Sequence, residues 1–221
     1  MKSSIVATTL IGLACTMPVY SQDMLTPAFV VGDRWSYRET DLLTKLETSQ
    51  LTEKLVSADA AEYRIDARRV ARTWWRGDAA NIAHREQFAY SEAGEGRRGK
   101  VIATSDGGCA FPWPLKDGMT FECSEKALAV NGWKLRFDLE FAVEAAESVE
   151  TPAGKFETLR VVGKGFVDNE TTDTISRVER VVWLSPAAKR EVKTESRTIL
   201  KSGQIWRVDG RELVAFTAGG T

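Results

Sequence analysis

Short runs of alternating apolar and polar residues, separated by turn residues, make up most of the chain. The clearest run is 133-143, WKLRFDLEFAV, in which apolar side chains take the odd positions and charged side chains take the even positions as far as 140. A period of two predicts a strand with one buried and one solvated face. A helical stripe through Leu135, Leu139 and Val143 also fits, and the following EAAES favours helix. The aromatic side chains at the odd positions favour the strand.

Similar runs recur along the chain and predict further strands. They lie at 34-39, 45-57, 63-70, 84-90, 100-105, 119-125, 156-166, 174-184, 190-200 and 204-217. Asn131-Gly132 is a good hairpin signal, and Asp209-Gly210 is a second one. Ten or more short strands joined by tight turns predict an all-β fold, a mostly antiparallel meander.

The first 21 residues have the pattern of a secretory signal peptide: Lys2, an apolar run, then small residues before a cleavage site after Ser21. Cys15 suggests lipidation instead, but Gly12 stands where a lipobox has a branched aliphatic residue. No later window is long and apolar enough for a transmembrane segment. We therefore expect a periplasmic or secreted protein, with 22-221 as a single β domain; the alternative is a division near residue 107, where Gly and Pro cluster.

Two cysteines remain once Cys15 leaves with the signal peptide. Cys109 and Cys123 enclose a segment that contains Pro112 and Pro114. An oxidising compartment and an even number of thiols predict a Cys109 to Cys123 disulfide, and two buried free thiols are the alternative. The prolines cannot donate ladder hydrogen bonds, so this segment is expected to be a crossover and not a central strand.

Charge and motifs exclude several classes of function. The formal net charge is -1 at pH 7, and loss of Lys2 makes it one unit more negative, which disfavours a nucleic-acid partner. The single histidine, His84, is expected to be structural or exposed, so no histidine-based catalytic or metal site is predicted, and no cofactor motif occurs. Carboxylates cluster at two places, which we interpret as solvated acids: Glu144, Glu147 and Glu150, then Asp168, Glu170 and Asp173.

Seven tryptophans are many for a chain of 221 residues. Aromatic side chains can close the core of a curved sheet or line an apolar cavity. Adjacent residues on a strand face opposite ways, so either Trp74 or Trp75 is expected to meet solvent, a groove or a partner.

The second half of the chain resembles a family of bacterial exported proteins described as TapB-like or as a domain of unknown function. The resemblance covers about residues 111-193 and consists of a Pro-Leu-Gly segment, a V-x-x-P-A-G-x-F turn and a Trp-Pro corner followed by Val-Lys. The matching residues are Pro114, Leu115, Gly118, Val149, Pro152, Ala153, Gly154, Phe156, Trp183, Pro186, Val192 and Lys193. Ala187 and Ala188 depart from the family pattern, which has glycine at this corner. The resemblance implies a curved, half-open barrel similar to periplasmic lipoprotein-carrier folds, with no established activity.

Three functions follow as hypotheses. The first is a non-enzymatic exported protein that binds a lipid-like or other hydrophobic ligand on the concave face, through Trp133, Phe137, Phe141 and Trp183. The second is a cell-envelope interaction protein that uses a sheet edge or exposed aromatics. The third is a hydrolase with two carboxylates in one cleft.

Overall fold

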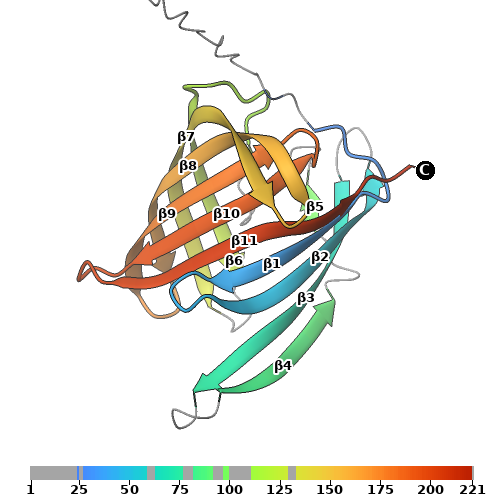
Figure 1. Cartoon of the computed structure of the whole chain (residues 1–221). Helices are drawn as coiled ribbons and strands as arrows, with labels where there is room; N and C mark the ends of the chain where they lie inside the picture. The colour runs from blue at the N-terminus through green and yellow to red at the C-terminus, as the bar shows by residue number, and fades with distance from the viewer. Residues whose placement is uncertain are drawn as a thin grey trace, which may run out of the picture.

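The computed structural model describes residue 24 and residues 27-58, 63-76, 82-91, 97-99, 111-128 and 133-220. Eleven strands form one sheet (Figure 1). They are β1 Arg34–Asp41, β2 Leu46–Ala58, β3 Tyr63–Arg76, β4 Ile82–Ser91, β5 Arg97–Gly99, β6 Thr120–Leu128, β7 Lys134–Thr151, β8 Gly154–Asn169, β9 Thr174–Ser185, β10 Arg190–Ile199 and β11 Ile205–Thr217. The predicted strand at 100-105, the Asn131-Gly132 turn and the signal sequence lie outside the described residues.

The strand order is β4-β3-β2-β1-β11-β10-β9-β8-β7-β6, with β5 beside β3. Every strand pairing in this sheet is antiparallel. Two meanders, β1 to β4 and β6 to β11, are joined where the first and last strands pair, and Figure 1 shows the sheet curling into a half-open barrel. The predicted all-β fold is confirmed. Within the described ranges, no helix is long and apolar enough to cross a bilayer.

Strand β7 confirms the period-two prediction for residues 133-143. Leu139, Phe141 and Val143 are buried, while Asp138 and Glu140 are exposed. The EAAES segment does not form a helix, because β7 continues to Thr151 as the partner of β8. Cross-strand pairing thus overrides local helix propensity in this segment.

One turn agrees with its prediction from the sequence, and two differ from theirs. Gly154 has a positive φ of 126°, as the turn pattern predicts. At the Pro186 corner, Lys189 takes the left-handed conformation, with φ 62°, instead of Ala187 or Ala188. The hairpin predicted at Asp209-Gly210 is wrong, since both residues lie inside β11 and pair with β1.

The core has two separate clusters of buried side chains. The apolar cluster joins β7, β8 and β9 and includes Met24 and two residues of the segment before β6, Phe111 and Leu115. Leu115 exchanges backbone hydrogen bonds with Met24, so this Pro-rich segment is a crossover that covers the sheet. The mixed cluster spans β1, β2, β3, β10 and β11 and comprises Trp35, Tyr37, Leu51, Leu55, Ile65, Ala188, Val192 and Leu213.

Candidate functional site

Two of the predicted ligand residues lie in or against the apolar cluster. Phe141 is 0% exposed. Its ring stacks on Phe121, with centroids 5.2 Å apart, and meets the edge of Phe111 at 6.1 Å. Phe137 is half-buried against the same cluster, and the Arg180 guanidinium lies 5.6 Å from its ring centroid. Around Phe141 the concave surface is therefore filled with protein side chains.

Trp183 is half-buried and packs against the mixed cluster instead of the apolar one. Its neighbours across the strands are Arg160 on β8 and Lys193 on β10. The indole N–H donates to a carboxylate oxygen of Glu147, and the Lys193 ammonium lies 5.0 Å from the ring centroid. Trp133 is half-buried just before β7. The four predicted ligand residues therefore do not converge on one binding surface.

The other predicted residues lie partly or wholly outside the described regions. In the backbone pairing of β3 and β4, Trp74 is opposite His84 and Trp75 is opposite Ala83, but their side chains are not described. Cys123 is half-buried against the apolar cluster. Cys109 lies outside the described residues, so the Cys109 to Cys123 disulfide stays a prediction.

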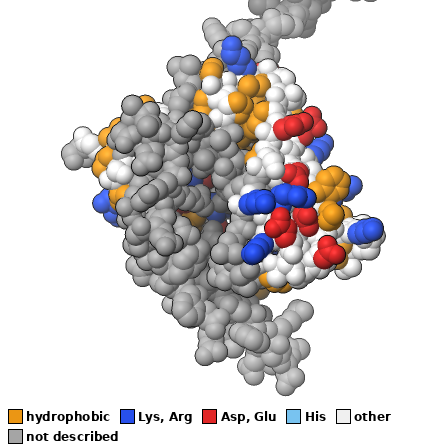
Figure 2. Space-filling model, turned by 180° about the vertical axis from the view of Figure 1, so that it is seen from behind, with side chains coloured by type: hydrophobic (Ala, Val, Ile, Leu, Met, Phe, Trp, Pro, Cys, Tyr) orange, Lys and Arg blue, Asp and Glu red, His pale blue; other side chains and the backbone are white. Residues whose placement is uncertain are grey.

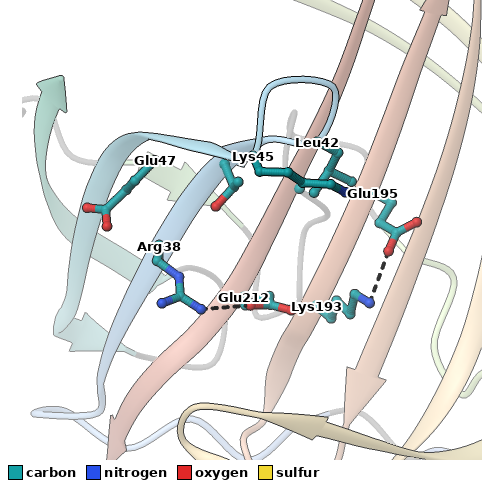
Figure 3. Close-up of a pocket in the computed structure, with 9 residues that line it drawn as sticks. Arg38, Leu42, Lys45, Glu47, Lys193, Glu195 and Glu212 are labelled. Carbon is teal, nitrogen blue, oxygen red and sulfur yellow. Dashed lines mark hydrogen bonds and ion pairs between the residues drawn. The ribbon is translucent and has the colours of Figure 1, made fainter. Parts of the chain in front are cut away.

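A pocket of about 360 Å³ opens on the outer face, over β1, β10 and β11 (Figure 3). The turn between β1 and β2 forms its roof. The Asp41 carboxylate accepts hydrogen bonds from the backbone N–H groups of Leu43, at 2.8 Å, and Thr44, at 3.2 Å. Lys45 closes the turn with a φ of 62°. Such side-chain to backbone bonds fix the shape of a short turn.

Gly210 explains why this turn folds back over the sheet. A Cβ at Gly210 would lie 2.9 Å from Cδ2 of Leu42, which is closer than real Cβ contacts. The backbone N–H of Leu42 also donates to the Val208 carbonyl at 2.8 Å. The glycine that suggested a hairpin thus provides space for the roof of the pocket.

Charged side chains of both signs line the pocket. The Arg38 guanidinium lies 3.1 Å from the Glu212 carboxylate, and the Lys193 ammonium lies 3.0 Å from Glu195. Lys45 and Glu47 complete a set of three cations and three anions, with Thr40, Leu42 and Gly210. No histidine, cysteine or serine is among these nine residues. The lining is suited to recognition of charged groups and unsuited to a lipid chain.

A second charged cluster is buried inside the mixed cluster. Arg190, 2% exposed, lies 2.5 Å from Glu53 and 3.0 Å from Glu191, and both carboxylates are 0% exposed. Burial opposes the charged guanidinium, but the carboxylates of Glu191 and Glu53 outweigh it and raise the pKa of Arg190 well above its usual value. Two acids do converge here, but they share one arginine and are closed off from solvent.

Tyr37 belongs to the same buried cluster. Its hydroxyl donates to the Glu191 carbonyl at 3.1 Å, and the Arg211 guanidinium lies 5.4 Å from its ring centroid. Burial raises the Tyr37 pKa well above its usual value, and the Glu191 carboxylate adds to the shift. Tyr37 is therefore a neutral hydrogen-bond donor, which is a structural role.

Charge of both signs also covers the rear surface over β6, β7 and β8, where Figure 2 shows blue and red side chains side by side. Arg136 lies 3.1 Å from Asp168 and 3.2 Å from Asp138. In the described part of the chain, no group of three or more His, Cys, Asp or Glu could hold a metal ion. Glu170 and Asp173 are exposed near the β8–β9 turn, as expected of solvated acids, whereas Asp168 is half-buried and pairs with Arg136.

No family model matches the chain, so membership of the TapB-like family is not confirmed. No curated protein matches it either. Three solved structures are similar. A Parabacteroides distasonis protein, provisionally described as a lipoprotein, is 14% identical, with 89% of this chain and 100% of that chain covered and a TM-score of 0.52.

The other two similarities are weaker. A Bacteroides fragilis protein, provisionally described as exported and as having a YmcC-like fold, is 15% identical over 89% of this chain and 100% of that chain, with a TM-score of 0.49. The hypothetical lipoprotein YmcC from Escherichia coli is 10% identical over 87% of each chain, with a TM-score of 0.38. What these comparisons establish is a shared fold between this chain and the Parabacteroides distasonis protein.

Proposed function

We propose that this protein is an exported, non-enzymatic binding protein of the bacterial cell envelope, and that it holds a protein partner on the outer face of its sheet. Export is supported by the signal-like first 21 residues and by the description of the Parabacteroides distasonis protein as a lipoprotein. The partner recognised here is a polypeptide segment that carries both an acidic and a basic side chain.

The proposal rests on one contrast between the two faces of the sheet: side chains fill the inner face around Phe141, whereas the outer face has an open pocket. On the inner face, Phe141 is covered by Phe111 and Phe121 and has no exposed surface. On the outer face, the pocket beneath the β1–β2 turn is open and is lined by charged side chains. A hydrophobic ligand needs an apolar concave surface, so the carrier hypothesis has less support than a polar interaction surface.

The charges of the pocket favour a partner of mixed charge. Arg38 and Glu212 lie on adjacent strands and are partly exposed, at 41% and 34%. Exposed ion pairs contribute little to stability, which leaves both groups available to exchange partners at an interface. An acidic side chain of the partner would meet Arg38 and Lys45, and a basic one would meet Glu195 and Glu212.

Site-specific photo-crosslinking in the producing bacterium tests this proposal. A photoreactive residue in place of Thr40, inside the pocket, is expected to give a discrete crosslinked product with one protein. The matched control replaces Lys164, which is exposed on β8 away from the pocket, and is expected to give none. Arg38→Glu should abolish the crosslinked product. The double variant Arg38→Glu with Glu212→Arg can re-form the ion pair with its charges reversed, but it should not restore the product, because the partner requires the original arrangement of charges.

Two results would contradict the proposal. One is equal crosslinking from positions 40 and 164, which indicates random encounter. The other is a lipid-like molecule that co-purifies in native mass spectrometry and is lost when Phe141 is replaced by Trp. That result would support the carrier hypothesis instead, because the larger ring would compete with a ligand for the inner face.

A further inference from the structure

The β10–β11 hairpin projects at one end of the barrel, where Figure 1 shows its tip beyond the neighbouring strands. Its turn is well defined: the Leu200 N–H donates to the Gln204 carbonyl at 2.9 Å, and the Gly203 N–H donates to the Leu200 carbonyl at 2.8 Å. Gly203 has a φ of 85°, which suits glycine. The tip is therefore an ordered element that can present side chains in a fixed direction.

Large apolar side chains are exposed at this tip. Ile205 is 43% exposed and Trp206 is 54% exposed. A tryptophan ring is amphipathic and is enriched where an apolar phase meets water. Neither side chain belongs to, or packs against, the two core clusters of the described residues.

Further exposed apolar side chains lie at the same end of the sheet. Ile205 is opposite Ile199, Ile199 is opposite Arg177, and Arg177 is opposite Phe166. Phe166 is 57% exposed, and at the usual strand spacing it lies about 14 Å across the sheet from Ile205. Ile205 and Phe166 therefore lie along one rim of the sheet, with the buried Ile199 and the charged Arg177 between them.

The hairpin is also cationic. From Arg197 to Arg207 the sequence RTILKSGQIWR contains three basic residues and no acidic residue. At the base of the hairpin, Arg197 lies 3.8 Å from Glu179 and Arg207 lies 2.6 Å from Asp209. Lys201, at the tip, has no ion pair with any residue that the structure describes. The tip thus combines an apolar surface with an uncompensated positive charge.

We propose that the β10–β11 hairpin docks on the surface of a lipid bilayer that contains anionic lipid. Trp206 and Ile205 enter the headgroup region, and Lys201 contacts lipid phosphate. Apolar side chains beside basic ones are the combination that binds an anionic interface, because area burial and electrostatic attraction add. The proposal goes beyond the proposed function and does not depend on it.

Docking in this way keeps the outer-face pocket accessible. Gly210 and Glu212 of the pocket lie on β11, and they follow Trp206 in the same strand. At about 3.3 Å per residue they are about 13 to 20 Å from the tryptophan. A hairpin that enters only the headgroup region therefore leaves the pocket in water, where it can meet a partner.

Vesicle flotation tests the proposal with the exported protein, after mass spectrometry has verified that it carries no acyl chain. We expect binding to vesicles of phosphatidylglycerol and phosphatidylethanolamine at low salt, and little binding to phosphatidylcholine alone. High salt should weaken the binding, because it screens the charge of Lys201. Trp206→Ser and Lys201→Glu should each reduce the partition coefficient about tenfold.

Matched controls separate docking from a general loss of structure. Val31→Ser removes an apolar side chain that is 50% exposed in the turn before β1, and Lys155→Glu reverses an exposed charge next to the β7–β8 turn. Both should bind vesicles like the unchanged protein. Brominated lipid should quench the fluorescence of the unchanged protein more than that of Trp206→Phe, which reports the position of this ring directly.

The proposal is overturned if the unchanged protein stays unbound with anionic vesicles at low salt. It is also overturned if Trp206→Ser and Lys201→Glu bind as the controls do. If the hairpin crosslinks to a protein in cells while vesicle binding is absent, the rim is a protein interface. None of these outcomes affects the crosslinking test at position 40, so failure of the two proposals can be distinguished.

Discussion

The two core clusters lie in one continuous sheet but are built from different chemistry. The apolar cluster is held by ring stacking and aliphatic packing, as in the Phe121, Phe141 and Phe111 group. The mixed cluster contains the same kinds of apolar side chain, but Arg190, Glu53 and Glu191 are buried among them. The strands around the two clusters are also connected differently along the chain.

Strands around the apolar cluster are neighbours in the sequence. The β7–β8 and β8–β9 pairs are hairpins, so their turns set the register of the strands. The core side chains there need only pack together and do not have to specify the register. The mixed cluster contains the pairing of β1 with β11, the first and last strands, which no turn connects. We infer that directional polar contacts specify the register there, a role attested for buried polar groups elsewhere.

Several polar contacts hold the first strand and the residue before it against the β9–β10 turn and the end of the chain. The Trp35 indole donates to the Ala188 carbonyl at 2.7 Å. Buried Asp33 accepts hydrogen bonds from the Lys189 ammonium, at 2.9 and 2.8 Å, and from the Gly219 N–H, at 2.8 Å. Arg211 on β11 lies 2.6 Å from Glu39 on β1. A shift of β1 by one residue along β11 would move these groups by about 3.3 Å, beyond hydrogen-bond distance unless the side chains rearrange.

The largest effect is expected from removal of the buried guanidinium. Arg190→Leu leaves the carboxylates of Glu53 and Glu191 buried without it, and should lower the free energy of unfolding by about 3–5 kcal/mol. Urea unfolding followed by fluorescence measures the change. Arg136→Leu is the matched control, since Arg136 is 42% exposed and its partner Asp168 is 23% exposed, and should cost about 1 kcal/mol or less. Equal losses in the two variants would contradict a special role for the buried cluster.

A smaller effect is expected in the apolar cluster from Gly163→Ala. A Cβ at Gly163 would overlap the ring of Phe141, so the free energy of unfolding should fall by about 1–3 kcal/mol. Phe141→Leu in the same chain should recover part of this loss, because it removes the ring. Gly165→Ala is the matched control: its Cβ would meet the Asp138 carbonyl, which is backbone, so Phe141→Leu should not rescue it. Additive losses in the first pair would refute the packing argument.

Alternation along the chain predicted the strands well, because strands with one buried face repeat every two residues. It failed where that period is interrupted. Arg190, Glu191 and Val192 are consecutive and all buried, since the register of β10 against β9 shifts between Glu191 and Lys193. A bulge of this kind turns an extra side chain inward and leaves no clear sequence signal. The buried ion cluster was therefore not predictable from the pattern.

The outer-face pocket could not be predicted for a different reason. Its residues come from β1, β2, β10, β11 and one turn, which are brought together only by the pairing of the chain ends. The nearest signal was Asp209-Gly210, which alternation placed inside a strand and turn propensity placed in a hairpin. A glycine within a strand indicates close approach by another segment, and here that segment is the Leu42 turn.

The smallest effect is expected at Asp209, on β11 opposite Asp41. Burial raises the pKa of the Asp209 carboxyl above its ordinary value of 3.8, and the ion pair with Arg207 opposes that shift only in part. A raised pKa in the folded state means that protonation stabilises the fold. This contribution is present below about pH 3.8 and is lost as the pH rises through the higher folded value.

Asp209→Asn removes this dependence on pH. Relative to the unchanged protein, the variant should therefore gain stability as the pH rises from about 3.5 to about 6.5, by less than about 1 kcal/mol because the group is partly solvated. Urea unfolding at several pH values measures the difference. Arg207→Gln should steepen the pH dependence, since it removes the charge that opposes the shift. If Asp209→Asn instead loses relative stability with rising pH, the Arg207 ion pair outweighs burial in setting the pKa of Asp209.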